Sequence, residues 1–62
     1  MERYNVYVDF TGVERKKTSG TKMWPSLSGQ EVKELITNWD LYILPYREDD
    51  KEEITIKIKP VK

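Results

Sequence analysis

The sequence predicts one α+β domain in which four antiparallel strands and a single helix follow the order β-β-α-β-β, with the helix packed on one face of a small sheet. Three observations support this prediction. Apolar and polar residues alternate strictly at 4–10 and at 53–59, near the two ends of the chain. An amphipathic stretch with a helix-start signature lies between them at 27–39. At 62 residues, the chain 1–62 has room for a single domain.

The first predicted strand spans residues 4–10, and a second strand follows it at a sheet edge. β-branched and aromatic side chains occupy every second position of the first strand, so one of its faces belongs to the core. These positions are Tyr4, Val6, Val8 and Phe10. Gly12 and the polar residues after it predict a turn, from which residues 16–24 return as the edge strand. Pro25 has no N–H to donate and is expected to end this strand.

The helix is predicted from a capping box. Ser28 is the expected N-cap, and Glu31, three residues later, can reach back to the backbone N–H of Ser28. Leu27 and Val32 flank this start and are placed to contact each other as a hydrophobic staple. Apolar residues then recur at i, i+3, i+4 and i+7, which turns one stripe toward the core. The stripe consists of Val32, Leu35, Ile36 and Trp39.

Two further strands are predicted after the helix. Residues 41–46, with the sequence LYILPY, form the third strand, and Pro45 places it at an edge. A hydrophilic loop at 47–52 leads to the last strand, 53–59, in which isoleucines alternate with polar residues. The first and last strands have the strongest patterns and are expected side by side at the centre of the sheet. The predicted core is Val6, Val8, Phe10, Val32, Leu35, Ile36, Ile54, Ile56 and Ile58.

The composition argues against an enzyme and against a metal or cofactor site. The chain contains no histidine and no cysteine, so it offers neither imidazole bases nor thiol nucleophiles nor the usual transition-metal ligands. Eleven basic and eleven acidic residues cancel, whereas binding to phosphate backbones normally requires a basic excess. We therefore expect no enzyme activity, no cofactor and no nucleic-acid partner. No apolar run is long enough for a signal or membrane segment, which predicts a cytoplasmic protein without a membrane partner.

Two charged clusters lie in the predicted loops and edge strand, and both are interpreted as solvated surface. Carboxylates at 48–53 would suit a hard cation or phosphate mimicry, but Arg47 and Lys51 are interleaved with them and no glycine pivots a calcium loop. A basic cluster would contact phosphates if the protein bound nucleic acid. Its members are Arg15, Lys16, Lys17 and Lys22.

Aromatic residues are more numerous than one small core can hide, which makes them candidates for an interface. They are Tyr7 on the solvent side of the first strand, and Trp24, Trp39, Tyr42 and Tyr46 near the predicted helix ends. Trp39 fits the core as the last residue of the helix stripe. For Tyr7 and Trp24, partner contact and an ordinary surface position stay equally open. Together with the short chain and the edge strand at 16–24, this surplus favours a homodimer.

The order of these parts resembles the small dimeric uracil-DNA glycosylase inhibitors of Bacillus phages, which are of about this length. The similar parts are a tyrosine-led alternating strand (Tyr4, Val6, Val8), a polar hairpin, and Ser26-Leu27-Ser28-x-x-Glu31-Val32 opening the helix. The closing strand, Glu53-Ile54-x-Ile56-x-Ile58, is similar to the family's ending as well. The resemblance covers most of the chain in outline, although 39–51 is longer here than the family pattern.

The resemblance implies a phage-type inhibitor that acts as a DNA mimic, forms a homodimer and blocks the DNA-binding cleft of the host uracil-DNA glycosylase in the host cell cytoplasm. Only Glu31 carries over as an interface carboxylate. The family builds a hydrophobic cage from helix aromatics, whose matching positions here are Gln30 and Glu34. Other aromatics are therefore expected to supply an apolar recess. The predicted partner-binding residues are Glu31, Glu34, Gln30, Trp24, Trp39, Tyr42 and Asp40.

Two alternative functions stay open. In a small single-stranded nucleic-acid-binding module, Tyr7 and Trp24 would stack bases beside the basic cluster. A phage antagonist of some other host protein would share the inhibitor's physical chemistry and differ only in its partner.

Overall fold

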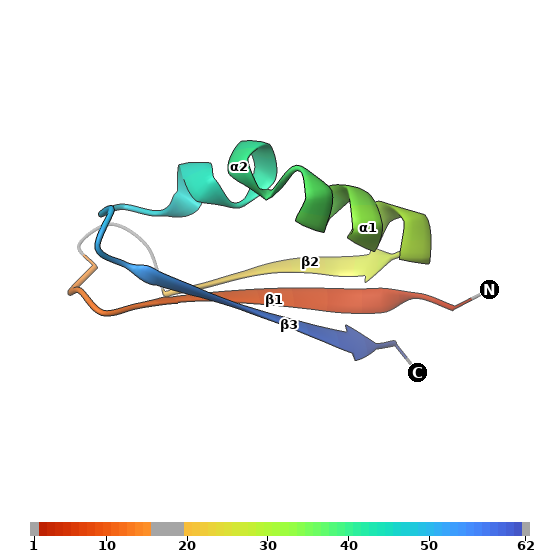
Figure 1. The fold of residues 1–62 in the computed structure, drawn as a ribbon. Helices are drawn as coiled ribbons and strands as arrows, with labels where there is room; N and C mark the ends of the chain where they lie inside the picture. Colours follow the sequence, from red (N-terminus) through yellow and green to blue (C-terminus); the bar gives the residue numbers. More distant parts are fainter. Residues whose placement is uncertain (1, 16–19, 62) are drawn as a thin grey trace.

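The structure, a computed structural model, describes residues 2–15 and 20–61. It is an α+β fold in which a three-stranded antiparallel sheet carries two short helices and a 3-10 turn on one face (Figure 1). The elements in chain order are β1 (Tyr4–Thr11), β2 (Thr21–Leu27), α1 (Gly29–Thr37), α2 (Trp39–Tyr42), η1 (Leu44–Tyr46) and β3 (Glu53–Pro60). The α+β class is confirmed, whereas the prediction of four strands is wrong.

β1 is the central strand, with β2 on one side and β3 on the other. Val6, Val8 and Phe10 are buried as predicted, because β1 has a neighbour on each edge and the helices above it. The expectation that the first and last strands are adjacent is confirmed by an antiparallel register that runs without interruption from Tyr4↔Pro60 to Thr11↔Glu53. Only β1 is central, however, and β3 forms an edge of the sheet.

β2 begins and ends later than predicted. The expected strand at 16–24 is observed as Thr21–Leu27, and residues 16–19 lie outside the described part of the chain. Pro25 does not end the strand, because an edge strand needs no donor on its free side. The register shifts between Tyr4 and Val6, and Ser26 opposite this irregularity has a positive φ of 56°. Its N–H donates to the Asn5 Oδ1 at 3.0 Å, so the distorted backbone keeps a hydrogen bond.

α1 begins where the sequence predicts. Ser28 is the N-cap, with its Oγ accepting from the Glu31 N–H at 3.2 Å and its own N–H donating to Glu31 Oε1 at 2.9 Å. This is a complete capping box. Asn38 ends the helix, where its N–H still donates to the Glu34 carbonyl at 2.9 Å but its ψ of 37° leaves the helical range.

The third strand predicted at 41–46 is instead the short helix α2 followed by the 3-10 turn η1. The chain resumes a helical course after Asn38, and the Ile43 N–H donates to the Trp39 carbonyl at 2.8 Å. Pro45 fits the first turn of η1 because its fixed φ suits a helix start and no N–H is needed there. Ile43 is fully buried, at the i+4 position from Trp39. The helical period of the sequence therefore continues through a segment that was interpreted as a strand.

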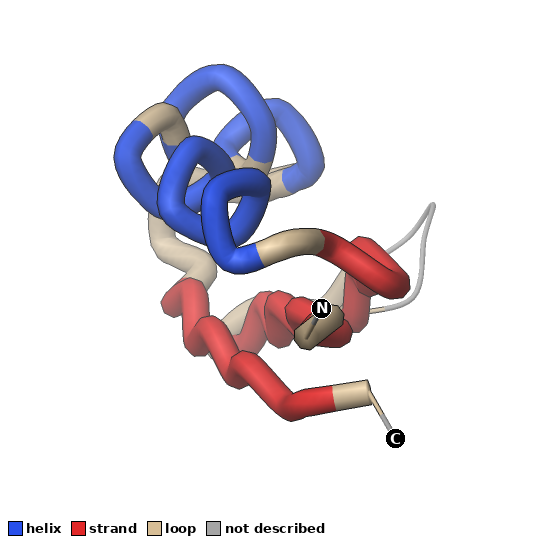
Figure 2. Tube along the Cα trace, turned by 90° about the vertical axis from the view of Figure 1, so that its right-hand side faces the viewer, coloured by secondary structure: helices blue, strands red, loops and turns tan. Residues whose placement is uncertain are grey.

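The core is smaller and differently placed than predicted. The buried residues are Val6, Val8, Phe10, Leu35 and Ile43, and Trp24, Leu27, Val32 and Ile54 are partly buried against them. Ile56 and Ile58 are exposed, with 36% and 47% of their surface accessible. The reason is that α1 packs over β1 and β2, whereas β3 runs away from the helices toward its C-terminal end (Figures 1 and 2).

The two charged clusters interpreted as solvated each contribute one residue to the interior. Glu52 is fully buried at its side chain, and Arg15 is 8% exposed. Arg15 Nη1 donates to both Glu52 carboxylate oxygens at 2.9 and 2.8 Å, and its Nη2 donates to the Tyr46 carbonyl at 2.8 Å. The guanidinium carbon lies 4.9 Å from the centre of the Phe10 ring. This ion pair links the loop after β1, which carries Arg15, to Glu52, the residue that precedes β3.

Candidate functional site

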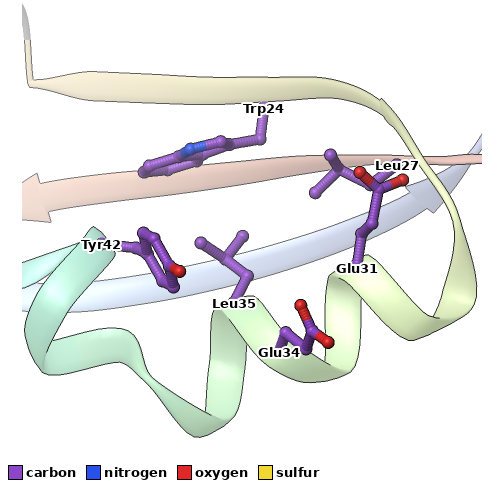
Figure 3. A pocket seen from close by; sticks show the side chains of 6 residues that line it. All are labelled: Trp24, Leu27, Glu31, Glu34, Leu35 and Tyr42. Carbon is purple, nitrogen blue, oxygen red and sulfur yellow. The ribbon is translucent and has the colours of Figure 1, made fainter.

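An open recess lies between β2 and the helices. Its volume is about 220 Å³. Its lining residues are Trp24, Leu27, Glu31, Glu34, Leu35 and Tyr42 (Figure 3). The recess combines four of the predicted partner-binding residues, since β2 supplies one aromatic ring, α2 supplies another, and α1 supplies two carboxylates.

The floor and walls of the recess are apolar. Trp24 pairs with Val6 and therefore projects from the same face of the sheet, toward the helices. Figure 3 shows Leu35 rising from α1 toward the Trp24 ring and Tyr42 closing one end. Tyr46 holds the Trp24 ring edge-on, with the two ring centres 5.9 Å apart. Aromatic faces supported in this way form a surface suited to an apolar side chain.

The Glu31 carboxylate lies at the opposite end of the recess, beside Leu27 (Figure 3). The hydrogen bond from the Ser28 backbone N–H lowers the pKa of Glu31 below its ordinary value of 4.5, and the Ser28 side chain and the Arg3 guanidinium lower it further. Arg3 Nη1 lies 3.3 Å from Glu31 Oε1 in an exposed ion pair. Glu31 is therefore a fixed negative charge at neutral pH, although Arg3 neutralises part of its field.

The Glu34 carboxylate lies three residues after Glu31, which places both acids on neighbouring positions of one helix surface. Gln30 supports it, since the Gln30 Nε2 donates to Glu34 Oε1 at 3.4 Å. Gln30 is exposed and is not among the residues that line the recess. The two carboxylates form a negative rim beside the apolar hollow.

The structure separates the other predicted residues from this recess. Trp39 lines a second groove of about 360 Å³ on the β3 side, with Ile36, Arg47, Glu52, Ile54 and Ile56. Asp40 is exposed in the first turn of α2 and lines neither hollow. Leu27 and Leu35 were predicted as a staple and a core residue, not as site residues. The signal for Leu35 was its spacing of four from Glu31, which puts both side chains on the same side of the helix.

The residues proposed for nucleic-acid stacking do not form one surface. Tyr7 alternates with the buried Val6 and Val8, so it projects from the face of the sheet opposite to Trp24. Lys59 Nζ lies 5.7 Å from the Tyr7 ring centre. In the basic cluster, the Arg15 side chain is only 8% exposed and is paired with Glu52. Lys16 and Lys17 lie outside the described residues, and Lys22 Nζ lies 4.7 Å from the Tyr46 ring centre.

Within residues 2–15 and 20–61, the structure contains no group of three or more acidic side chains arranged to hold a metal ion. None of the helices in that part of the chain has the length and apolarity needed to cross a membrane. Comparison of the chain with models of known protein families, with curated proteins and with solved structures finds no match.

Proposed function

We propose that this protein is a phage-type inhibitor of uracil-DNA glycosylase that acts as a DNA mimic and occupies the DNA-binding cleft of the enzyme. The observation that supports the proposal most directly is the recess itself. It joins an apolar hollow, walled by Trp24 and Tyr42, to the carboxylates of Glu31 and Glu34. These are the two features that a competitor for such a cleft requires.

The requirement follows from the chemistry of the enzyme. A cleft that holds the phosphate backbone must be electropositive, so a competitor gains affinity from carboxylates held at fixed positions. An enzyme that flips a base out of the duplex fills the vacated stack with an apolar side chain. A competitor therefore also needs a hollow to receive that side chain. In this protein α1 supplies both carboxylates and also Leu35, which lines the hollow.

A net charge of zero is compatible with this role, because steering depends on where the charges lie. Glu31 and Glu34 lie on the helical layer, whereas Lys57 projects from the opposite face of the sheet, 3.7 Å from Asp9. The protein thus presents its rim carboxylates away from this cation. A cationic partner group would compete with Arg3 for Glu31.

The direct test is a uracil-excision assay with the protein in clear molar excess over the glycosylase. We expect excision to stop, and capture of the glycosylase from a bacterial lysate on immobilised protein. Excision at its normal rate would exclude the assignment. Capture of a different protein, with unchanged excision, would favour an antagonist of another host protein.

Substitutions at the rim of the recess test whether this surface contacts the glycosylase. Glu34→Lys reverses one rim charge without touching the capping box, and we expect it to weaken inhibition at least tenfold by placing a cation against a cationic cleft. Asp50→Lys makes the same charge change in the loop before β3 and serves as the matched control. Equal inhibition by both variants would mean that the recess is not the contact surface.

The nucleic-acid alternative is tested with the same samples. Binding to single-stranded oligonucleotides that weakens steeply from low to moderate salt would support it, whereas no binding at low salt would exclude it.

A further inference from the structure

The free edge of β3 has none of the features that protect the free edge of β2. β2 carries Pro25, an irregular register and the positive φ of Ser26, all of which oppose pairing with another strand. β3 pairs regularly with β1 along its whole length, and its one proline is Pro60 at the last position. A regular edge strand of eight residues is a template for a further strand, provided that the added strand does not place cations against Lys57 and Lys59.

The isoleucines of β3 turn their backbone groups toward this free edge. The Val61 N–H donates to the Arg3 carbonyl at 2.8 Å, so the odd-numbered residues of this segment face β1. In an antiparallel pair, residues whose N–H and C=O face the neighbouring strand alternate with residues whose N–H and C=O face away from it. The even-numbered residues of β3 therefore direct these groups to the free edge. Those residues are Ile54, Ile56 and Ile58. Pro60 has the same orientation, so the N–H that it lacks would lie on the free side.

The side chains next to this edge are apolar and uncovered. Ile56 and Ile58 project from the helix side of the sheet but extend beyond the helices, and both are exposed. Trp39 borders the same region across the second groove and is 43% exposed. Exposed apolar side chains beside an unpaired edge indicate a surface that another chain covers.

We propose that the free edge of β3 pairs with β3 of a second copy of this chain. The two strands are antiparallel and related by a twofold axis at Ile56. This register pairs Ile56 with Ile56 and Ile54 with Ile58 of the second copy, so each isoleucine meets an isoleucine. On the other face Glu53 meets Lys59 of the second copy, and Thr55 meets Lys57. The strand is therefore complementary to itself in shape and in charge.

Other registers lose this complementarity. A centre at Lys57 puts two lysines against each other, and a centre at Ile58 puts Lys57 against Lys59 of the second copy, both of which are unfavourable. A centre at Thr55 places Ile58 opposite Glu52. With the centre at Ile56, every isoleucine also forms a pair that exchanges two backbone hydrogen bonds.

The resulting dimer has one continuous six-stranded sheet with both helical layers on the same face, because the twofold axis is perpendicular to the sheet. The recess of Trp24 and Tyr42 lies on the β2 side and stays open in both copies. The interface gives a surface to the homodimer that the sequence predicts, and it does not depend on the identity of the target enzyme.

A charge swap tests the interface by sedimentation at micromolar concentration, where we expect the native protein to be a dimer. Lys59→Glu places two Glu–Glu pairs across the interface and is expected to weaken dimerisation about tenfold. Glu53→Lys combined with Lys59→Glu restores opposite charges and should restore the dimer. Both positions are exposed in the single chain, so folding is not at risk.

Two further variants separate this edge from general surface apolarity. Ile56→Lys puts two cations on the twofold axis and is expected to give a monomer. Met23→Lys changes an apolar residue on β2 that is 43% exposed, against 36% for Ile56, and should leave the dimer intact. Circular dichroism of each variant confirms that the fold is retained.

Cysteine pairs test the register. The chain has no cysteine, so each introduced thiol is unique. A mixture of Thr55→Cys and Lys57→Cys should oxidise to a disulfide-linked dimer faster than either variant alone, because these positions face each other in a non-hydrogen-bonded pair about 4.5 Å apart at Cα.

A native protein that sediments as a monomer at 100 μM would overturn the proposal whether or not it inhibits the glycosylase. A dimer unaffected by Ile56→Lys, or one in which Thr55→Cys alone oxidises fastest, would overturn this edge or this register. Inhibition of uracil excision is measured separately, so failure of the target assignment would leave the dimer result unchanged.

Discussion

At the scale of single residues, Glu31 has two roles. Its carboxylate closes the capping box on Ser28, and it also forms part of the negative rim of the recess. Glu31→Ala would therefore remove a structural hydrogen bond together with a charge. Glu31→Gln separates the two roles, because glutamine at this position still reaches the N-cap backbone but carries no charge. Weaker inhibition by Glu31→Gln, in a variant that stays folded under the assay conditions, would assign the charge to partner binding.

The lowered pKa of Glu31 predicts a pH dependence of stability. Its pKa is lower in the folded chain than in the unfolded one, so its contribution is fully present above the ordinary value of 4.5 and is lost as pH falls through the folded pKa. We expect the urea midpoint of the native protein to fall below that pH more steeply than that of Glu31→Gln. Thermal or urea unfolding between about pH 7 and about pH 3 measures it. Parallel curves for the two proteins would contradict the prediction.

The ion pair between Arg15 and Glu52 is a second residue-scale feature with a testable consequence. Glu52→Gln removes the buried anion of the pair and leaves Arg15 only the more exposed Glu48, whose Oε2 lies 3.3 Å from Nη2. Breaking a buried pair in this way typically costs up to roughly 3–5 kcal/mol of unfolding free energy. Urea denaturation measures this loss. Glu14→Gln, an exposed acid next to Arg15, is the control and should change stability by less than about 0.5 kcal/mol. A small loss for Glu52→Gln would mean that Glu48 or solvent replaces Glu52 as the partner of Arg15.

At the scale of elements, the capping box of α1 and the buried Ile43 between α2 and η1 decide how the helical layer sits on the sheet. Ser28→Ala removes the N-cap acceptor and should cost about 1 kcal/mol. For a domain of this size that loss lowers Tm by about 4–8 °C. Ser28→Asn, which keeps a capping oxygen, should lie close to the native Tm. Equal loss for both substitutions would show that the cap contributes little.

Ile43 distinguishes the helical segment from the strand that the sequence suggested. It is fully buried at the junction between α2 and η1, whereas Ile58 in β3 is 47% exposed. Ile43→Ala is therefore expected to cost about 2–5 kcal/mol through lost burial and the cavity left behind. Ile58→Ala should cost much less at protein concentrations below dimerisation. The reverse order, measured by urea unfolding, would mean that β3 and not α2 supplies the core.

At the scale of the whole molecule, one sheet edge is protected and the other is open. A chain of 62 residues buries a small core, so covering β3 would add stability that depends on protein concentration. We expect Tm to rise with concentration for the native protein and to be constant for Ile56→Lys. The single chain has a Cα radius of gyration of 12.2 Å, so scattering at high concentration should give a distinctly larger value for the dimer.

The sequence by itself determined the features that depend on neighbouring residues. The alternation of β1 and β3 and the capping box at Ser28 and Glu31 were predicted correctly, because strand faces and helix caps arise from spacings of two and three residues. The tertiary structure alone decided which apolar residues are covered. Ile43 is buried and Ile58 is exposed because α1 lies over β1 and β2 and the C-terminal part of β3 extends beyond the helices. No local pattern records where a helix will rest. The meeting of Arg15 with Glu52, across 37 residues of sequence, was decided in the same way.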